Sequence, residues 1–254
     1  MVGLGRRGFE RRQHGKMAAY FWSKLGMGFR LLSCRRWVVG TVAAGLLLTA
    51  AWPGRASLVD FSDNLTAFVE KRWGREALTR MSVWQRLVRD NKAATAAGGR
   101  AEMVGLKQVN AFFNQVPFVS DLQNWKVEDY WATPTEMLGT FGGDCEDYSI
   151  AKYLSLKEIG VPIEKLRITY VRAINLGESH MVLAYYLTPD ADPLILDNLT
   201  GDIRPASQRT DLVPVYSFND DDLWVPGNAS RKGGASNVRL WRDLLEKLAK
   251  EQRM

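Results

Sequence analysis

The sequence has few of the side chains that form disulfide bonds or bind zinc, with two cysteines and two histidines among 254 residues. Cys34 and His14 lie in the basic N-terminal segment, so residues 57–254 keep only Cys145 and His180. One cysteine and one histidine cannot form an internal disulfide or a Cys/His zinc cluster. The composition therefore excludes a disulfide scaffold and a zinc finger for this part of the chain, and it leaves one unpaired thiol to be explained.

An excess of positive charge is also missing from most of the chain. The net charge is +6, but the residues up to Val59 hold ten Lys or Arg and one acid, so that segment carries +9 and the remainder carries −3. The basic character belongs to the N-terminus, and the folded part offers no electrostatic basis for nucleic-acid binding.

The apolar run at residues 37–52 is shorter than the roughly 18–20 residues that a membrane-spanning helix needs. It follows Arg35 and Arg36 and precedes small residues at Ala51 and Ala56, which is the order of parts in a secretory signal. We therefore predict a leader at residues 1–56 and an exported, periplasmic domain at residues 57–254, without stable membrane insertion after cleavage. The alternative is an uncleaved membrane anchor.

Helical periodicity dominates the first part of the domain. The predicted helices cover residues 58–88, with Gly74 as a dividing point, 102–113, a short helix starting at Thr133-Pro134, and 145–159. The small, polar residues 91–99 predict a loop.

β-branched and aromatic residues dominate the part that follows. The predicted strands are residues 166–173, 181–187, 193–196, 212–218 and 223–225, and a closing helix at 238–250 follows a loop at 227–236. Helices that precede strands indicate an α+β fold, in which an N-terminal helical layer packs on an antiparallel sheet.

Cys145 follows two glycines and Asp144 and opens a predicted helix, where the helix dipole favours a thiolate. His180 begins one predicted strand and Asp197 ends the next, so a hairpin would bring the two together. Cys145, His180 and Asp197 thus match a nucleophile, a base and the group that orients the base. Singly, each residue also fits a structural role: a core cysteine, a hydrogen-bonded histidine and a turn aspartate.

Three segments carry a resemblance to a known family. Residues 142–148 (GGDCEDY), 178–182 (ESHMV) and 196–198 (LDN) resemble the bacterial transglutaminase-like cysteine proteinases, over roughly residues 73–224. The resemblance implies a papain-like or transglutaminase-like fold, with Cys145 as nucleophile, His180 as base and Asp197 as its orienter.

The resemblance also implies a calcium site on Asp144 and Glu146 and cleavage of a large surface adhesin near an Ala-Ala bond. It further implies sequestration by an inner-membrane receptor for cyclic di-GMP, and release of the adhesin would promote biofilm dispersal. The long arginine-rich leader is not part of the family pattern.

A separate physical argument also favours calcium binding. The proposed thiolate is crowded by three carboxylates, those of Asp144, Glu146 and Asp147. Negative neighbours raise the pKa of a thiol, and a bound hard cation reverses that effect. Acids at a helix N-terminus also simply complement the dipole, so this pattern alone leaves both interpretations open.

Other functions use the same residues. A transglutaminase or a peptidoglycan amidase would employ the same three side chains, and a non-catalytic domain of this fold would only bind a partner. Asn124 and Trp125 are candidates for an oxyanion donor or a cleft wall, with a core position as the alternative for the aromatic side chain.

Overall fold

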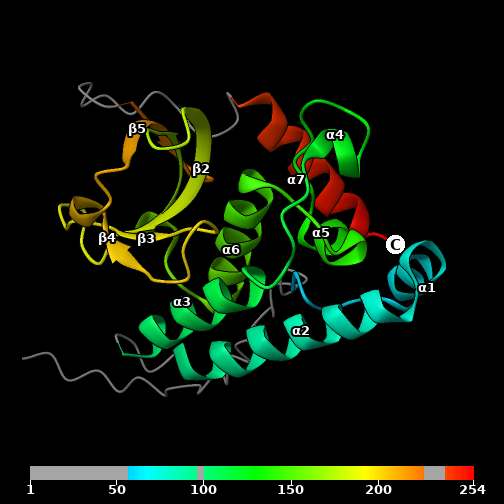
Figure 1. The fold of residues 1–254 in the computed structure, drawn as a ribbon. Coiled ribbons are helices and arrows are strands. Elements are labelled where there is room, and N and C mark those ends of the chain that lie inside the picture. The colour runs from blue at the N-terminus through cyan, green and yellow to red at the C-terminus, as the bar shows by residue number, and fades with distance from the viewer. Residues whose placement is uncertain (1–56, 96–99, 226–237) are drawn as a thin grey trace, which may run out of the picture. The chain divides into compact units, whose positions relative to one another are not determined.

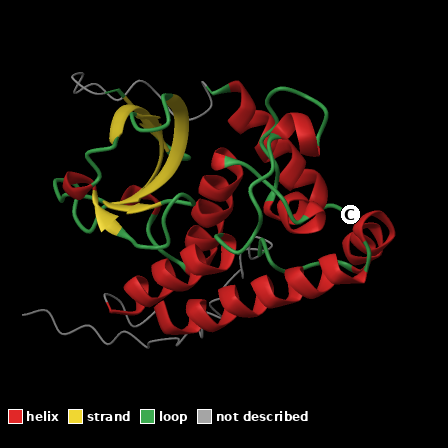
Figure 2. Ribbon diagram, in the orientation of Figure 1, coloured by secondary structure: helices red, strands yellow, loops and turns green. Residues whose placement is uncertain are grey.

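The computed structural model describes residues 57–95, 100–225 and 238–254 (Figures 1 and 2). The leader predicted at residues 1–56 lies outside the described residues, as do residues 96–99 of one predicted loop and the loop at 227–236. Among the described helices, each is too short or too polar to cross a membrane.

Two helices open the described part of the domain. Helix α1 covers Asp63–Trp73, and Ser62 caps it by accepting a hydrogen bond from the Leu65 amide. Gly74 then adopts φ 82°, a conformation that favours glycine, and α2 runs over Arg75–Thr95. The division at Gly74 is confirmed.

The predicted loop at residues 91–99 is wrong in its first part, because α2 continues to Thr95. The buried Asn91 amide donates to the Leu87 carbonyl and to Gln108 Oε1, so it joins α2 to the next helix. A tertiary contact thus keeps small polar residues helical, where their local preference is for a loop.

Four further helices agree closely with the prediction: α3 (Arg100–Phe113), α5 (Pro134–Thr140), α6 (Cys145–Ile159) and α7 (Arg239–Glu251). The four-residue helix α4 (Asp121–Asn124) was not predicted. Thr133 and Glu136 form a reciprocal capping box at the start of α5, and Gly160 ends α6 at φ 105°.

Within the described residues, six antiparallel strands form one sheet in the order β4-β3-β2-β1-β5-β6. Their bounds are β1 Leu166–Ala173, β2 Glu178–Tyr185, β3 Leu194–Leu196, β4 Arg204–Pro205, β5 Leu212–Phe218 and β6 Leu223–Trp224. Strands β1 and β5 have the predicted bounds, whereas β2 begins three residues earlier, at Glu178. Sequence analysis missed β4, which has only two residues.

Helix α6 lies at the centre of the domain, between the sheet on one side and α2 and α3 on the other (Figure 1). Its side chains are buried on nearly every face, and Ser155 accepts a hydrogen bond of 2.8 Å from Trp84 Nε1 of α2. From α7, the Trp241 ring packs edge-on against Tyr153 and Phe218. The α+β fold with a helical layer on an antiparallel sheet is therefore confirmed.

Candidate active site

Gly142 and Gly143 precede Cys145 in a tightly packed segment that leaves no room for a Cβ atom. A Cβ on Gly142 would lie 2.8 Å from Val119, and one on Gly143 would lie 2.9 Å from the Asp147 carboxylate. The Val119 amide donates to the Gly143 carbonyl at 2.9 Å, which aligns this segment beside residues 117–119. Only glycines fit here, and they place Cys145 at the first turn of α6.

The Cys145 thiol is partly buried, and Sγ lies 3.0 Å from Glu146 Oε2. Burial and then the Glu146 charge raise the pKa of the Cys145 thiol, while a hydrogen bond from the Met181 backbone opposes this shift. The Met181 contact brings Cys145 beside strand β2, next to His180. Without a compensating charge, burial and the acidic neighbours together favour the less reactive thiol form of Cys145.

His180 and Asp197 meet across two neighbouring strands. His180 is the third residue of β2, and Asp197 directly follows β3, which pairs antiparallel with β2. His180 Nε2 lies 2.8 Å from Asp197 Oδ1, and both side chains are buried. The pairing leaves Nδ1 of the imidazole available to a second group.

Asp197 is held by several groups at once. Besides His180, the Leu199 amide donates to Oδ1 at 3.0 Å and Arg209 Nη2 donates to Oδ2 at 2.8 Å. Burial alone would raise the pKa of Asp197, but the hydrogen bonds from His180, Leu199 and Arg209 lower it to about 2. Asp197 is therefore an anion that keeps its charge in the interior.

A cavity of about 410 Å³ connects the thiol and the imidazole. Its lining comprises Asp129, Trp131, Cys145, Glu146, Tyr170, Ser179, His180, Met181, Tyr216, Val238, Arg239 and Leu240. A second cavity of about 710 Å³ runs along α7 and shares four of these residues. The structure thus brings Cys145, His180 and Asp197 together beside an open space.

Three carboxylates gather next to the thiol. Oxygens of Asp121, Asp144 and Glu146 all lie within 4.8 Å of one another. One oxygen of Asp121 and one of Asp144 are buried without a hydrogen-bond partner among the described residues. Burial first, and then neighbouring acids, raise the pKa of Asp144 to about 10, and burial raises that of Asp121 to about 6. Such an oxygen-rich cluster fits a hard cation such as Ca²⁺.

Sequence reasoning selected Asp144 and Glu146 but missed Asp121, which lies on α4, far from the motif. The polar stretch around Asp121 gave no spacing that singles it out. Asp147 has another role, because its carboxylate accepts from the backbone amides of Ala132 at 2.7 Å and Asp144 at 3.3 Å. It fixes the start of α6.

Asn124 and Trp125 lie close to this region. Asn124 Nδ2 contacts Thr140 Oγ1 at 3.2 Å and the Gly142 carbonyl at 3.3 Å, so its amide supports the glycine segment. The Trp125 ring packs on Tyr130 with centroids 4.5 Å apart. Neither residue is among those that line the cavity with Cys145.

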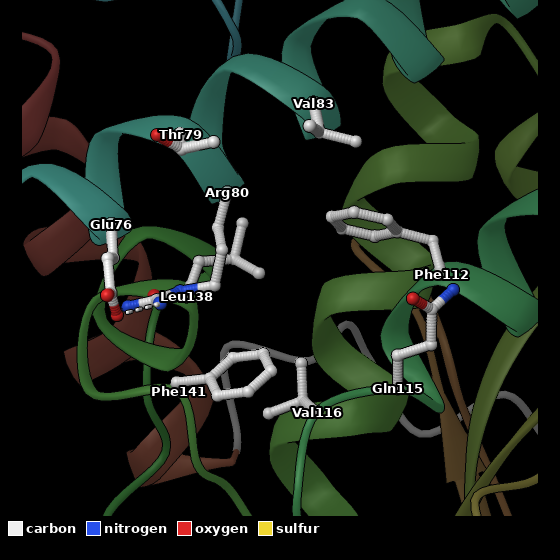
Figure 3. A pocket seen from close by; sticks show the side chains of 9 residues that line it. All are labelled: Glu76, Thr79, Arg80, Val83, Phe112, Gln115, Val116, Leu138 and Phe141. Carbon is white, nitrogen blue, oxygen red and sulfur yellow. Dashed lines mark hydrogen bonds and ion pairs between the residues drawn. The ribbon is translucent and has the colours of Figure 1, made fainter.

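Another cavity of about 410 Å³ lies between α2, α3 and α5 (Figure 3). Its walls are largely apolar, and Arg80 stacks on the Phe141 ring at 4.6 Å while its Nη1 lies 3.9 Å from Glu76. It contains no thiol or imidazole. Among the described residues, the thiol of Cys145 and the imidazole of His180 line the other cavity, beside the start of α6.

Known proteins match both the sequence and the fold. The profile of the bacterial transglutaminase-like cysteine proteinases (BTLCP) matches residues 85–229. A structure of Legionella pneumophila LapG is 37% identical, with a TM-score of 0.62 over 73% of this chain and 96% of that chain. Comparison with curated protein sequences gives no match.

Two further structures of Legionella pneumophila LapG differ in their treatment. The EGTA-treated form is 37% identical with a TM-score of 0.63, and it covers 73% of this chain and 96% of its own. The calcium-bound form is 36% identical with a TM-score of 0.61, and the match covers 73% of this chain and 97% of that chain. The chain belongs to the bacterial transglutaminase-like cysteine proteinases and is a cysteine peptidase.

Proposed function

We propose that this protein is a periplasmic, calcium-dependent cysteine endopeptidase with Cys145 as nucleophile, His180 as general base and Asp197 as the residue that orients the imidazole. The observation that carries the proposal is the 2.8 Å contact between His180 Nε2 and Asp197 Oδ1, beside the cavity that also contains the Cys145 thiol.

The reaction follows from these positions. With Nε2 bound to Asp197, Nδ1 of His180 takes the thiol proton, and the sulfur attacks the carbonyl carbon of a peptide bond. The imidazolium then protonates the departing amine, which leaves an acyl group on Cys145. A water molecule, deprotonated by His180, releases the acid and restores the thiol. The backbone N–H groups of the first residues of α6 are suited to stabilise the oxyanion.

Calcium would be held by Asp121, Asp144 and Glu146, whose crowded carboxylates gain a counter-charge when a cation binds. Bound Ca²⁺ would supply positive charge next to the thiol and favour the thiolate. Residues outside this trio must complete its shell of six to eight oxygens. The calcium-bound form of the LapG relative supports this assignment.

For the substrate, we propose a large surface adhesin cut near an Ala-Ala bond, with an inner-membrane cyclic-di-GMP receptor as the sequestering partner. Membership of the family and 37% identity to LapG support this choice, and the basic leader followed by an apolar run supports export. Release of the adhesin would free cells from a biofilm.

The test is incubation of the purified protein with the N-terminal region of a co-encoded adhesin, in calcium and in excess chelator. We expect cleavage at a pair of small residues, lost in chelator and in Cys145→Ala, with products identified by mass spectrometry. The exposed variant Ser82→Ala, on α2, serves as the matched control and should cut normally.

Other products would favour the other functions. Isopeptide cross-links would indicate a transglutaminase, and released muropeptides an amidase. Cleavage that persists in chelator would remove the calcium requirement. A Cys145→Ala protein with full biological function would indicate a binding domain without catalysis.

A further inference from the structure

Arg209 is a buried cation that sequence analysis did not select. Only 7% of its surface is exposed, and it lies between the short 3₁₀ turn at Ala206–Gln208 and β5. Its Nη2 donates to Asp197 Oδ2 at 2.8 Å, on the carboxylate edge that His180 does not use. Each oxygen of Asp197 is therefore held by a different charged or polar partner.

A second carboxylate fixes the guanidinium in turn. Arg209 Nε donates to Asp211 Oδ1 at 2.9 Å and Nη2 donates to Asp211 Oδ2 at 2.8 Å, a two-point contact that sets the plane of the group. The backbone turns tightly here, because the Leu212 amide donates to the Arg209 carbonyl at 3.0 Å. The start of β5 thus holds Arg209 in one orientation.

The burial of Arg209 has a free-energy cost that a purely structural contact would not require. Burial of a guanidinium costs free energy unless all its donors are paired, and Nη1 of Arg209 is buried with no partner among the described residues. The contact joins the end of β3 to the start of β5 through Asp197 itself. The fold therefore buries Arg209 beside the Asp197 carboxylate although one of its nitrogens lacks a hydrogen-bond partner among the described residues.

We propose that Arg209 is a positioning residue of this peptidase, which holds the Asp197 carboxylate so that Oδ1 points at His180 Nε2. The proposal rests on the proposed function of Asp197 as orienter of the imidazole. Asp211 anchors Arg209, and the buried side chain of Lys152 on α6 also interacts with the Asp197 charge. Arg209 acts through Asp197 and does not touch substrate.

The effect is expected on turnover rather than on substrate binding. In Arg209→Met, we expect kcat to fall roughly 10- to 100-fold, because small displacements of catalytic groups cost that much, while KM stays within about twofold. Arg209→Lys keeps one charge but loses the two-point contact, so it should recover part of kcat. Millimolar guanidinium should recover part of the activity of Arg209→Ala.

A second readout does not require the natural substrate. The rate at which iodoacetamide alkylates Cys145, measured in saturating calcium, should fall in Arg209→Met because the imidazole is less well aligned. Asp211→Asn should reduce kcat and the rate of Cys145 alkylation by a smaller factor than Arg209→Met does. Arg204→Met, which breaks the exposed pair with Asp202, is the matched control and should leave both unchanged.

Thermal unfolding must show that each variant is folded. A folded Arg209→Met with wild-type kcat and wild-type alkylation would overturn the proposal, and so would an equal loss in Arg204→Met. Failure of the wild-type protein to cut any peptide would count against the proposed function, while the alkylation rates would still decide the role of Arg209.

Discussion

At the scale of single residues, Lys152 places an ammonium group in the core. The side chain has no exposed surface, its Nζ has no hydrogen-bond partner among the described residues, and the ring of Tyr148 is 5.7 Å away. Burial lowers the pKa of Lys152 to about 7, although the Asp197 charge acts in the opposite direction. The folded protein therefore binds this proton less tightly than the unfolded chain does.

Lys152→Met should stabilise the protein near pH 7, by roughly 1–3 kcal/mol, with a gain that shrinks as pH rises toward 10. Between the folded pKa of about 7 and the unfolded value of 10.5, the unfolded state holds more protons, so wild-type stability rises with pH and the variant lacks that rise. Urea unfolding at pH 7, 8, 9 and 10 measures the difference. Lys107→Met, an exposed site on α3, is the control, and an equal gain there would contradict the explanation.

Sequence alone isolates some of the site residues and not others. Cys145 and His180 stand out because residues 57–254 contain no other cysteine or histidine, and Asp197 follows from the hairpin spacing. Asp121 and Arg209 do not stand out, because aspartate and arginine are common and their roles depend on contacts between distant segments. Scarce residue types are informative in a single sequence, whereas abundant ones need the fold.

At the scale of elements, α7 docks on the start of α5 through a carboxylate. Thr133 Oγ1 donates to Glu251 Oε1 at 2.6 Å, and the same hydroxyl caps α5 by accepting from the Glu136 amide at 3.1 Å. Burial, then the charge of Glu136, raise the pKa of Glu251 to about 7. The end of one helix is thereby linked to the beginning of another.

This contact should make the stability depend on pH. The folded pKa of Glu251, about 7, exceeds the usual 4.5, so the folded state holds more protons between these values and stability falls as pH rises through them. Glu251→Gln should remove this part of the pH dependence and raise the melting temperature at pH 8, with little change below pH 4.5. Glu246→Gln, exposed on the same helix, should show neither effect in calorimetry at both pH values.

Element boundaries follow from sequence where local and tertiary preferences agree. Helix α6 is predicted to the residue because two glycines and Asp144 precede Cys145, and Gly160 and Pro162 follow its last turn. The last turn of α2 is missed because Asn91 gains a partner on α3, and β4 is missed because two residues carry no periodicity. Elements fixed by one long-range contact remain invisible to pattern analysis.

At the scale of the whole molecule, the candidate calcium site joins separate parts of the chain. Asp121 belongs to α4, whereas Asp144 and Glu146 lie at the start of α6. A ligand that binds only the folded state stabilises it by mass action, by about 2.7 kcal/mol at a hundred times its Kd. Calcium is therefore expected to stabilise the entire domain.

Scanning calorimetry should show a melting temperature that is higher by several degrees in saturating calcium than in chelator, since 1 kcal/mol corresponds to roughly 2–4 °C in a domain of this size. Asp121→Asn should lose most of that difference, because it removes a ligand. Asp90→Asn, an exposed site on α2, should keep it. A melting temperature of the wild-type protein that does not respond to calcium would contradict the site.

The order of helices before strands is enough to predict the α+β class, yet the sequence does not reveal that α6 is enclosed by the sheet and by α2 and α3. Charged residues such as Lys152 and Asp147 on α6 suggest an exposed face, but both are buried. Their burial is possible because Asp147 is paired with backbone amides and Lys152 lies near an anion. These compensating contacts exist only in the folded molecule.

The candidate catalytic groups come from opposite sides of one packing boundary, since Cys145 begins a helix, whereas His180 lies in β2 and Asp197 directly follows β3. A slight sliding of helix against sheet would separate sulfur from imidazole and leave every hydrogen bond within each layer unbroken. On gentle heating, turnover would then be lost at a lower temperature than the secondary structure measured by circular dichroism. Enzyme activity should therefore report small changes in the packing of α6 against the sheet more sensitively than a measurement of secondary structure does.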